Sequence, residues 1–157
     1  MDQAVGLALA QSPVMLPSEP PVSRVGLRRP RILLVDDDPS VIRGLWRVLR
    51  AHRPEFHINT ASGAAQAIEA LCELGYDLVL TDWHMPGGGG RAVLEELIQH
   101  YPETARVVHT SHLDSDDTFE SCPAHVALAK PATESEILTA IDYALRRAGS
   151  EAVRAAS

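Results

Sequence analysis

Polar, chemically active side chains stand at the ends of four successive apolar segments of the chain. The segments are RILLVDDDPS, DLVLTDWHMP, ARVVHTS and HVALAKP, and the residues at their ends are Asp36, Asp37, Asp82, Thr110 and Lys130. If the segments are parallel strands, their carboxyl ends meet in one crevice of the sheet. Such a crevice can bind a hard divalent cation through carboxylate oxygens and keep one carboxylate as a nucleophile toward phosphorus.

Strand and helix patterns alternate along the chain from about Arg31. Short apolar runs such as ILLV are typical of buried parallel strands, and the stretches between them carry apolar residues at helical spacing. We therefore expect an α/β fold: a three-layer α/β/α sandwich of flavodoxin-like type, with a five-stranded parallel sheet in the order 2-1-3-4-5. The expected strands are Ile32–Val35, Phe56–Ala61, Leu78–Thr81, Arg106–Thr110 and Val126–Ala129. The expected helices are Pro39–His52, one with its apolar stripe over Ala64–Leu71, Ala92–Tyr101, and one that runs from Thr133 to near Arg147, while the poorly apolar SHLDSDDTFESCPA should form only a short or mobile helix.

Local signals predict where the helices begin and end. Asp38 is the expected N-cap of the first helix, because acidic residues favour a helix N-terminus. Ser62 is the expected N-cap of the second helix and Gly75 its left-handed stop. Thr133 and Glu136 form a capping box ahead of the last helix.

The length of 157 residues predicts one folded domain. Residues 1–30 contain five of the eleven prolines and no sustained period, so we expect a disordered, proline-rich arm. The domain is expected over 31–148, with a disordered tail over 149–157. This tail is too short for an output domain, which favours a stand-alone protein.

Composition narrows the classes of function. The formal net charge is −7, and we expect no Lys/Arg cluster in the folded part, which argues against direct nucleic-acid binding. Asp2 and several prolines surround the early apolar run AVGLALA, so it is a poor signal peptide, and we expect neither a transmembrane span nor membrane insertion. Cys72 is expected on the apolar face of a helix as a buried thiol, which suits the cytoplasm.

Side chains outside the crevice receive ordinary roles. Trp46 and Ile98 are placed on the inward faces of their helices, and Trp83 is assigned to packing. His125 is expected at the surface or in a loop, together with His52, His57 and His100. The run Gly87–Gly90 predicts a long flexible loop.

Taken together, ILLVDDDPS, DLVLTDWHMPGGGG, VVHTSH and ALAKP resemble the four signature segments of a two-component response-regulator receiver domain. The resemblance covers about Arg31 to Arg147. It implies that Asp82 accepts a phosphoryl group from a phosphohistidine donor, forming an aspartyl phosphate. It also implies that Thr110 carries the hydroxyl recruited by the phosphoryl group and that Lys130 supplies the cation that pairs with it.

The same resemblance implies a Mg²⁺ site and a set of partners. Asp36, Asp37, Asp82 and the backbone carbonyl of His84 would bind the ion, and no other cofactor is expected. The donor would be a sensor histidine kinase or a histidine-phosphotransfer protein, and output would pass to a downstream protein target, with a homodimer as one option. Chemistry would be limited to self-catalysed phosphorylation and autodephosphorylation, so we expect no enzyme in the usual sense.

Two departures and two alternatives accompany this interpretation. Ala127 stands where many receivers carry Tyr or Phe, and His84 and His112 occupy positions that tune the lifetime of the phosphoryl group. One alternative is a receiver fold that serves as a protein-binding scaffold without phosphorylation. The other is a phosphatase of the haloacid-dehalogenase type, which needs a second Asp where this chain has His84.

Overall fold

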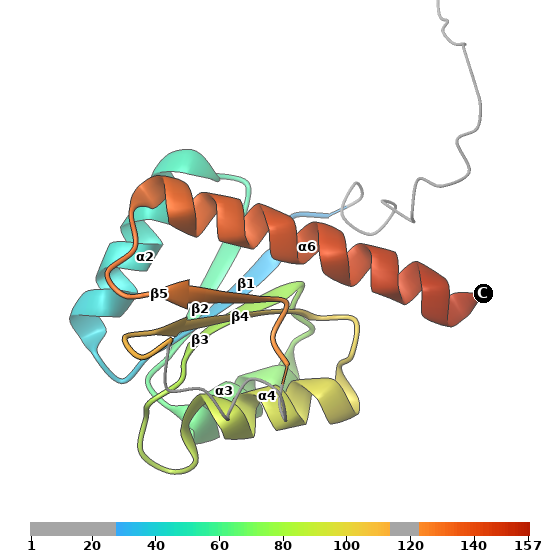
Figure 1. Ribbon diagram of the computed structural model, residues 1–157, viewed down its shortest axis with the longest axis horizontal. Helices are drawn as coiled ribbons and strands as arrows, with labels where there is room; N and C mark the ends of the chain where they lie inside the picture. The colour runs from blue at the N-terminus through green and yellow to red at the C-terminus, as the bar shows by residue number, and fades with distance from the viewer. Residues whose placement is uncertain (1–27, 114–122) are drawn as a thin grey trace, which may run out of the picture.

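The computed structural model describes residues 28–113 and 123–157 of the chain, and it contains a five-stranded sheet with helices on both faces (Figure 1). All strand pairs are parallel, and the strand order is β2-β1-β3-β4-β5, which confirms the predicted fold. The strands are β1 (Arg31–Val35), β2 (His57–Ala61), β3 (Leu78–Asp82), β4 (Ala105–Thr110) and β5 (Val126–Ala129). The helices are α2 (Pro39–His52), α3 (Ala64–Glu73), α4 (Gly89–His100) and α6 (Glu134–Ala156).

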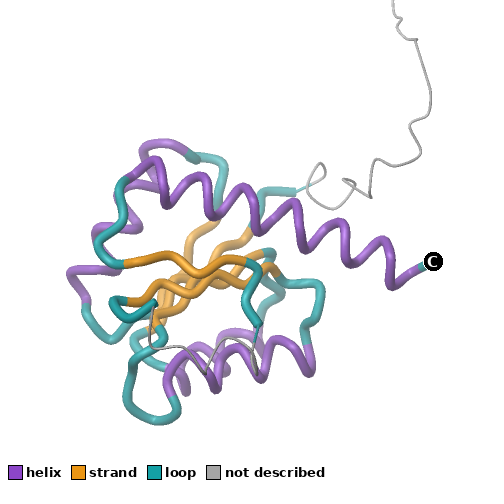
Figure 2. The backbone as a smooth tube through the Cα atoms, viewed as in Figure 1, coloured by secondary structure: helices purple, strands orange, loops and turns teal. Residues whose placement is uncertain are grey.

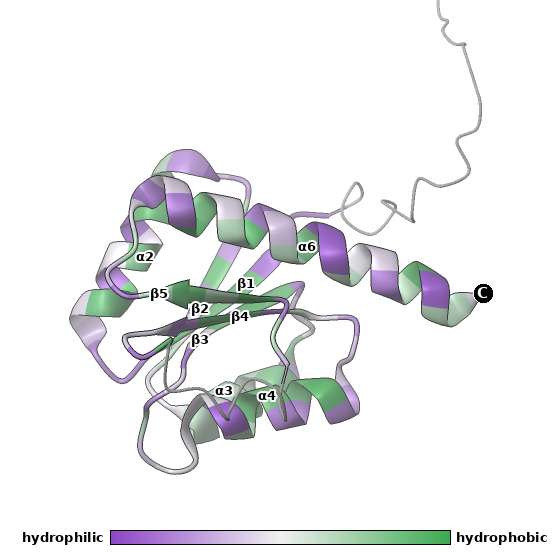
Figure 3. Cartoon of the chain, in the orientation of Figure 1, coloured by the Kyte–Doolittle hydropathy of each residue, from purple (hydrophilic) through white to green (hydrophobic). Residues whose placement is uncertain are grey.

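The sheet separates two apolar clusters. Leu45 of α2 and Ile141 of α6 belong to the cluster on one face, whereas Leu71 of α3 and Val93 of α4 belong to the cluster on the other. Figure 2 shows the strands enclosed between these two helix layers, and Figure 3 shows apolar colour concentrated on the strands and polar colour on outer helix surfaces. Because both faces are covered, every residue of β3 and β4 is buried.

Of the four residues predicted to begin or end a helix, two are confirmed and two are wrong. The side chain of Asp38 accepts a hydrogen bond from the backbone N–H of Ser40, and that of Thr133 accepts one from the N–H of Glu136, as predicted. The N-cap of α3 is Gly63, so the Ser62 assignment is wrong. The prediction that Gly75 is a left-handed stop is also wrong, since Gly75 is not among the glycines with positive φ. Helix α3 ends before it, and its C-cap, Leu74, has extended backbone.

The glycine run is partly helical, which corrects the expected flexible loop. Helix α4 begins at Gly89 rather than at Ala92, and Gly89 and Gly90 are buried. The backbone N–H of Gly90 donates to the carbonyl of Trp83 at 3.0 Å. A Cβ added at Gly90 would lie only 2.4 Å from the carbonyl oxygen of Asp82, so the close approach of the two backbones requires glycine there.

The last helix is longer than predicted and corrects the expected disordered tail over 149–157. Helix α6 continues to Ala156 and extends past the edge of the sheet (Figure 1). Glu151 on this extension contacts His125 Nε2 at 3.1 Å and lies 3.7 Å from Arg147. His125 lies in the loop before β5, which is one of its two predicted places, but its side chain is only 3% exposed and is therefore not at the surface.

At the other end, Arg28 forms two hydrogen bonds of 2.9 Å with Asp77, so ordered chain precedes the predicted start of the domain. The rest of the predicted arm, residues 1–27, lies outside the described residues, as do 114–122.

Several side chains are more exposed than their helical pattern indicates. Trp46 is 44% exposed, Ile98 and Cys72 are also exposed, and each therefore contradicts its predicted burial. The guanidinium carbon of Arg50 lies 5.6 Å from the centre of the Trp46 ring. Helix α2 carries three exposed arginines, at positions 43, 47 and 50. The expectation that the folded part contains no Lys/Arg cluster is therefore wrong.

Within the described residues, no helix has the length and apolar character that crossing a membrane would require.

Candidate functional site

The three predicted carboxylates meet at the carboxyl edge of the sheet. Strands β1 and β3 are neighbours, with Val35 opposite Thr81, so the residues that follow lie side by side. One oxygen from each of Asp36, Asp37 and Asp82 lies within 4.8 Å of the others. Asp36 and Asp82 are buried, whereas Asp37 is exposed.

Lys130 links the two buried carboxylates. It follows β5, and its Nζ lies 2.8 Å from Asp36 Oδ2 and 3.2 Å from Asp82 Oδ1. Desolvation lowers the pKa of Lys130, but the hydrogen bond and the negative charge of Asp36, with a further contribution from Asp82, outweigh it and raise the pKa overall. The ammonium therefore remains charged inside the crevice.

The acceptor predicted from sequence, Asp82, has the opposite electrostatic balance. Its pKa is raised, first because burial disfavours the carboxylate and second because Asp36 is negative, while Lys130 compensates only in part. The backbone N–H of His84 lies 3.4 Å from Asp82 Oδ1. Additional positive charge in the crevice would favour the ionised form of Asp82.

The donor set fits a hard divalent cation such as Mg²⁺. Asp36 is oriented on one oxygen by the N–H of Asp38, at 2.9 Å, and on the other by Lys130. Three carboxylates and one ammonium leave a charge of about −2, which one divalent cation balances. Asp36, Asp37 and Asp82 are the side chains that would hold it, and the carbonyl of His84 stays a predicted further ligand.

Thr110 ends β4 and is fully buried. Its Oγ1 accepts a hydrogen bond of 3.2 Å from the N–H of His112, and its carbonyl accepts one of 2.8 Å from the N–H of Lys130. The backbone thus connects the predicted hydroxyl and the predicted cation directly, across the β4 and β5 ends.

The two predicted tuning residues contact each other at the mouth of the crevice. The rings of His84 and His112 are edge to face, with centroids 5.0 Å apart and an interplanar angle of 79°. Both residues are exposed. Their effect on phosphoryl lifetime stays a prediction.

His109 is a residue beside the site that sequence reasoning missed. It precedes Thr110 on β4, it is buried, and neither ring nitrogen has a hydrogen-bond partner among the described residues. Burial, assisted by the charge of Lys130 and opposed by Asp36, lowers the pKa of His109 to about 4. A usable signal was present: a central parallel strand is buried on both faces, so a histidine within ARVVHT must point into one of the helix layers.

Comparison with known proteins identifies the family. Residues 32–142 match the family described as response regulator receiver domain. The chain is 31% identical over 129 residues to the transcriptional regulatory protein PrrA of Mycobacterium tuberculosis, an alignment that covers 81% of this chain and 54% of PrrA. The DNA-binding transcriptional regulator NtrC of Escherichia coli is 29% identical over 76% of this chain and 25% of its own length. The chain thus spans about half the length of PrrA and less of NtrC.

Solved structures agree with this match. The signal receiver domain of an HD domain-containing protein from Pseudomonas fluorescens Pf-5 superposes with a TM-score of 0.70 at 30% identity, over 78% of this chain and 99% of that one. A CheY-like receiver domain protein from Methanospirillum hungatei JF-1 reaches a TM-score of 0.70 at 22% identity, over 78% and 98% of the two chains, and supports the fold alone.

Proposed function

This chain belongs to the response regulator receiver family, and on that premise we propose that it is a phosphorylation-dependent switch whose phosphoacceptor is Asp82. The observation that supports the proposal most directly is the meeting of Asp36, Asp37 and Asp82 with Lys130 at one edge of the sheet. A structural role for these residues would not require three carboxylates so close together.

The proposed reaction is transfer of a phosphoryl group from a phosphohistidine to a carboxylate. An Asp82 oxygen attacks phosphorus, the P–N bond of the donor breaks, and the released imidazole nitrogen takes up a proton. Asp82 must be ionised for this attack, although its pKa is raised in the crevice. Mg²⁺, when bound, would supply positive charge to the phosphoryl oxygens.

Lys130 changes partner in this scheme. It pairs with Asp36 and Asp82 in the structure described, and the acylphosphate formed on Asp82 offers it new anionic oxygens. Thr110 lies at the adjacent strand end, where its hydroxyl can donate to the same group. Because Ala127 replaces the aromatic residue of many receivers, we place the response in the β4 end itself rather than in a rotating ring.

The proposed partners follow from the reaction. The donor is a sensor histidine kinase or a histidine-phosphotransfer protein, and a downstream protein reads the phosphorylated state. The chain catalyses only its own phosphorylation and dephosphorylation in this scheme. The proposed location is the cytoplasm.

Intact mass spectrometry with acetyl phosphate tests the proposal. We expect wild type to gain the mass of one phosphoryl group in the presence of Mg²⁺ and not in excess chelator, and Asp82→Asn to gain none. Asp142→Asn, a carboxylate that pairs with Arg53 outside the crevice, is the control and should label normally. If wild type fails to label under all these conditions, the scaffold alternative, which Ala127 slightly favours, replaces the switch.

A further inference from the structure

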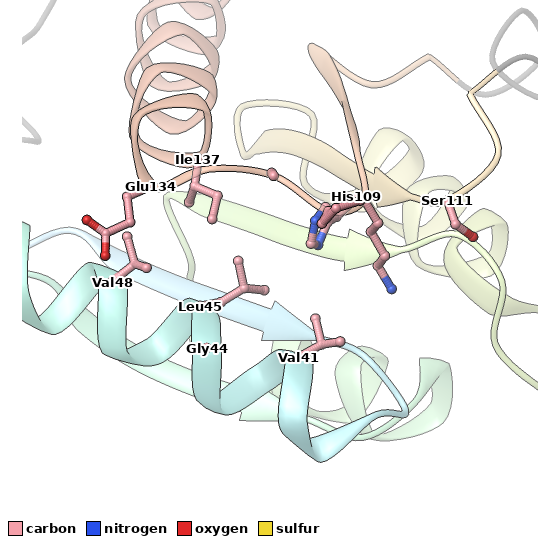
Figure 4. A pocket seen from close by; sticks show the side chains of 11 residues that line it. Val41, Gly44, Leu45, Val48, His109, Ser111, Glu134 and Ile137 are labelled. Atoms are coloured by element: carbon pink, nitrogen blue, oxygen red, sulfur yellow. The ribbon is translucent and has the colours of Figure 1, made fainter.

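A cavity of about 560 Å³ opens between α2, the start of α6 and the ends of β4 and β5. Figure 4 shows Val41, Leu45 and Val48 projecting from α2 toward Ile137 of α6, with the ring of His109 near the strand ends. The cavity lies on the α2 and α6 face of the sheet. It is therefore separate from the crevice between the carboxylates, although the stem of Lys130 contributes to its wall.

Most of the wall is apolar, and its polar residues are His109, Ser111, Lys130 and Glu134. Ser111 Oγ already lies within hydrogen-bond distance of His112 Nδ1, at 3.0 Å. Among the described residues, the two ring nitrogens of His109 are the only buried side-chain nitrogen or oxygen atoms without a hydrogen-bond partner. An unsatisfied buried polar group costs about 1–3 kcal/mol, so native proteins nearly always supply a partner. A molecule in the cavity is one source of that partner.

The charged side chains around the cavity already have other partners. The Lys130 ammonium is directed to Asp36 and Asp82, and the Glu134 carboxylate at the rim is 67% exposed to water and lies 3.2 Å from His52 Nε2. The depressed pKa of His109 keeps its ring neutral at physiological pH. A charged ligand would lose its hydration beside His109, whose ring is neutral, while Lys130 stays engaged with two carboxylates and Glu134 stays in water, so an uncharged occupant is favoured.

We propose that this cavity binds a small uncharged molecule with an aromatic or otherwise apolar body and one hydroxyl or N–H group that hydrogen-bonds to His109. A purely apolar occupant, such as an aliphatic side chain of a partner protein, would leave the imidazole unsatisfied. Both ring nitrogens lie beneath the cavity surface, so the ring must rotate slightly about its Cβ–Cγ bond. Histidine side chains have a broad preference about this bond, so the rotation is permitted.

Gly44 provides a way to close the cavity without touching His109. It lies on α2 among the lining residues, and a Cβ added there meets no atom of residues 28–113 or 123–157 within 4 Å. A leucine at this position would extend into the open space. Gly149 is equally open but lies on α6 away from the cavity, so Gly149→Leu is the matched control.

The experiment compares phenol with toluene, which has similar size but no donor, by NMR titration of the whole chain. We expect phenol to shift the amide signals of Leu45, Val48 and Ile137 together with the imidazole signals of His109, and to bind on the order of tenfold more tightly than toluene. His109→Leu should bring the ratio of the two affinities close to one. Gly44→Leu should abolish binding of both probes, and Gly149→Leu should leave it unchanged.

Several results would overturn the proposal. They are equal affinities of phenol and toluene for wild type, phenol shifts that persist in Gly44→Leu, and a bound water on His109 that phenol does not displace. The test needs neither phosphorylation nor Mg²⁺, so its outcome is independent of the proposed switch.

Discussion

Lys130 donates a hydrogen bond of 2.8 Å to Asp36, which lies 94 positions earlier in the chain. The contact joins the end of β5, an edge strand, to the end of β1, near the middle of the sheet. It also explains how two buried carboxylates remain compatible with the folded state when no cation is bound.

Lys130→Met should destabilise the metal-free protein by about 2–3 kcal/mol, because Asp36 and Asp82 lose their compensating charge. Millimolar Mg²⁺ should then raise the melting temperature of the variant more than that of wild type, since the crevice has become more negative. Urea unfolding and thermal melts with and without Mg²⁺ provide the measurement. Arg91→Met, which breaks an exposed pair with Glu95, should change stability by less than about 1 kcal/mol. Equal Mg²⁺ responses of wild type and Lys130→Met would contradict the assignment.

Asp82→Asn should stabilise the metal-free protein at pH 7. The folded state raises the pKa of Asp82, by burial first and by Asp36 second, so it binds this proton more tightly than the unfolded chain does. The resulting stability is complete below the unfolded pKa and is lost as the pH rises through the folded pKa. The advantage of the Asn variant should therefore grow between acidic and neutral pH. Asp37→Asn, at an exposed carboxylate, should show a smaller gain, and equal gains would refute this account.

His109→Leu should flatten the dependence of stability on pH. The folded pKa of about 4 lies below the reference value of 6.5, so the unfolded chain binds the proton first as the pH falls. Wild type should lose stability between these two values, by about 3 kcal/mol in total, with no further loss from this group below pH 4. Urea unfolding at pH 5 and pH 7.5 measures the difference, which should be clearly smaller in the variant. Parallel curves for the two proteins would show that the ring is not buried in its neutral form.

Gly90→Ala should destabilise the protein by about 1–3 kcal/mol and slow phosphorylation of Asp82, because the added Cβ collides with the backbone of that residue. Gly75→Ala, where the added atom meets nothing within 4 Å, should change stability by less than about 1 kcal/mol. Thermal melts and the rate of labelling by acetyl phosphate test both variants. Wild-type behaviour of Gly90→Ala would mean that the backbones can separate at little cost.

His84→Ala and His112→Ala should each change the rate of dephosphorylation, and the double variant should change it by less than the product of the two effects. The reason is that the rings contact each other at 5.0 Å beside Asp82, and an aromatic pair of this kind contributes about 0.5–1.5 kcal/mol. Decay of the phosphorylated protein, followed by intact mass, gives all four rates. Independent effects that simply multiply would show that the pair does not act as a unit.

Local sequence signals predicted the strand order and the crevice well, for a physical reason. Apolar runs, the Asp38 cap and the Thr133 cap act over a few residues, and parallel packing then brings strand ends together wherever they lie in the chain. The meeting of Asp36, Asp82 and Lys130 at one edge of the sheet could therefore be predicted from the sequence.

Features set by particular contacts that a residue pattern does not encode could not be predicted in this way. His125 is buried because Glu151 on the extended α6 and Arg106 on β4 surround it, and neither partner is near it in sequence. The start of α4 depends on the close approach of Gly90 to Trp83. From composition alone, a run of glycines predicts a loop instead. Trp46 has an inward helical pattern, yet its ring packs under Arg50 at the surface.

The alternation of side chains along β4 has a consequence for control of the domain. His109 and Thr110 are consecutive, so they face opposite sides of the sheet, one toward the cavity and one away from it. A shift of this strand end cannot change one environment without changing the other. By thermodynamic reciprocity, a cavity ligand whose affinity changes when Asp82 is phosphorylated alters the free energy of phosphorylation by the same amount. The concentration of such a ligand and the activity of a phosphodonor would then both control the position of the β4 end.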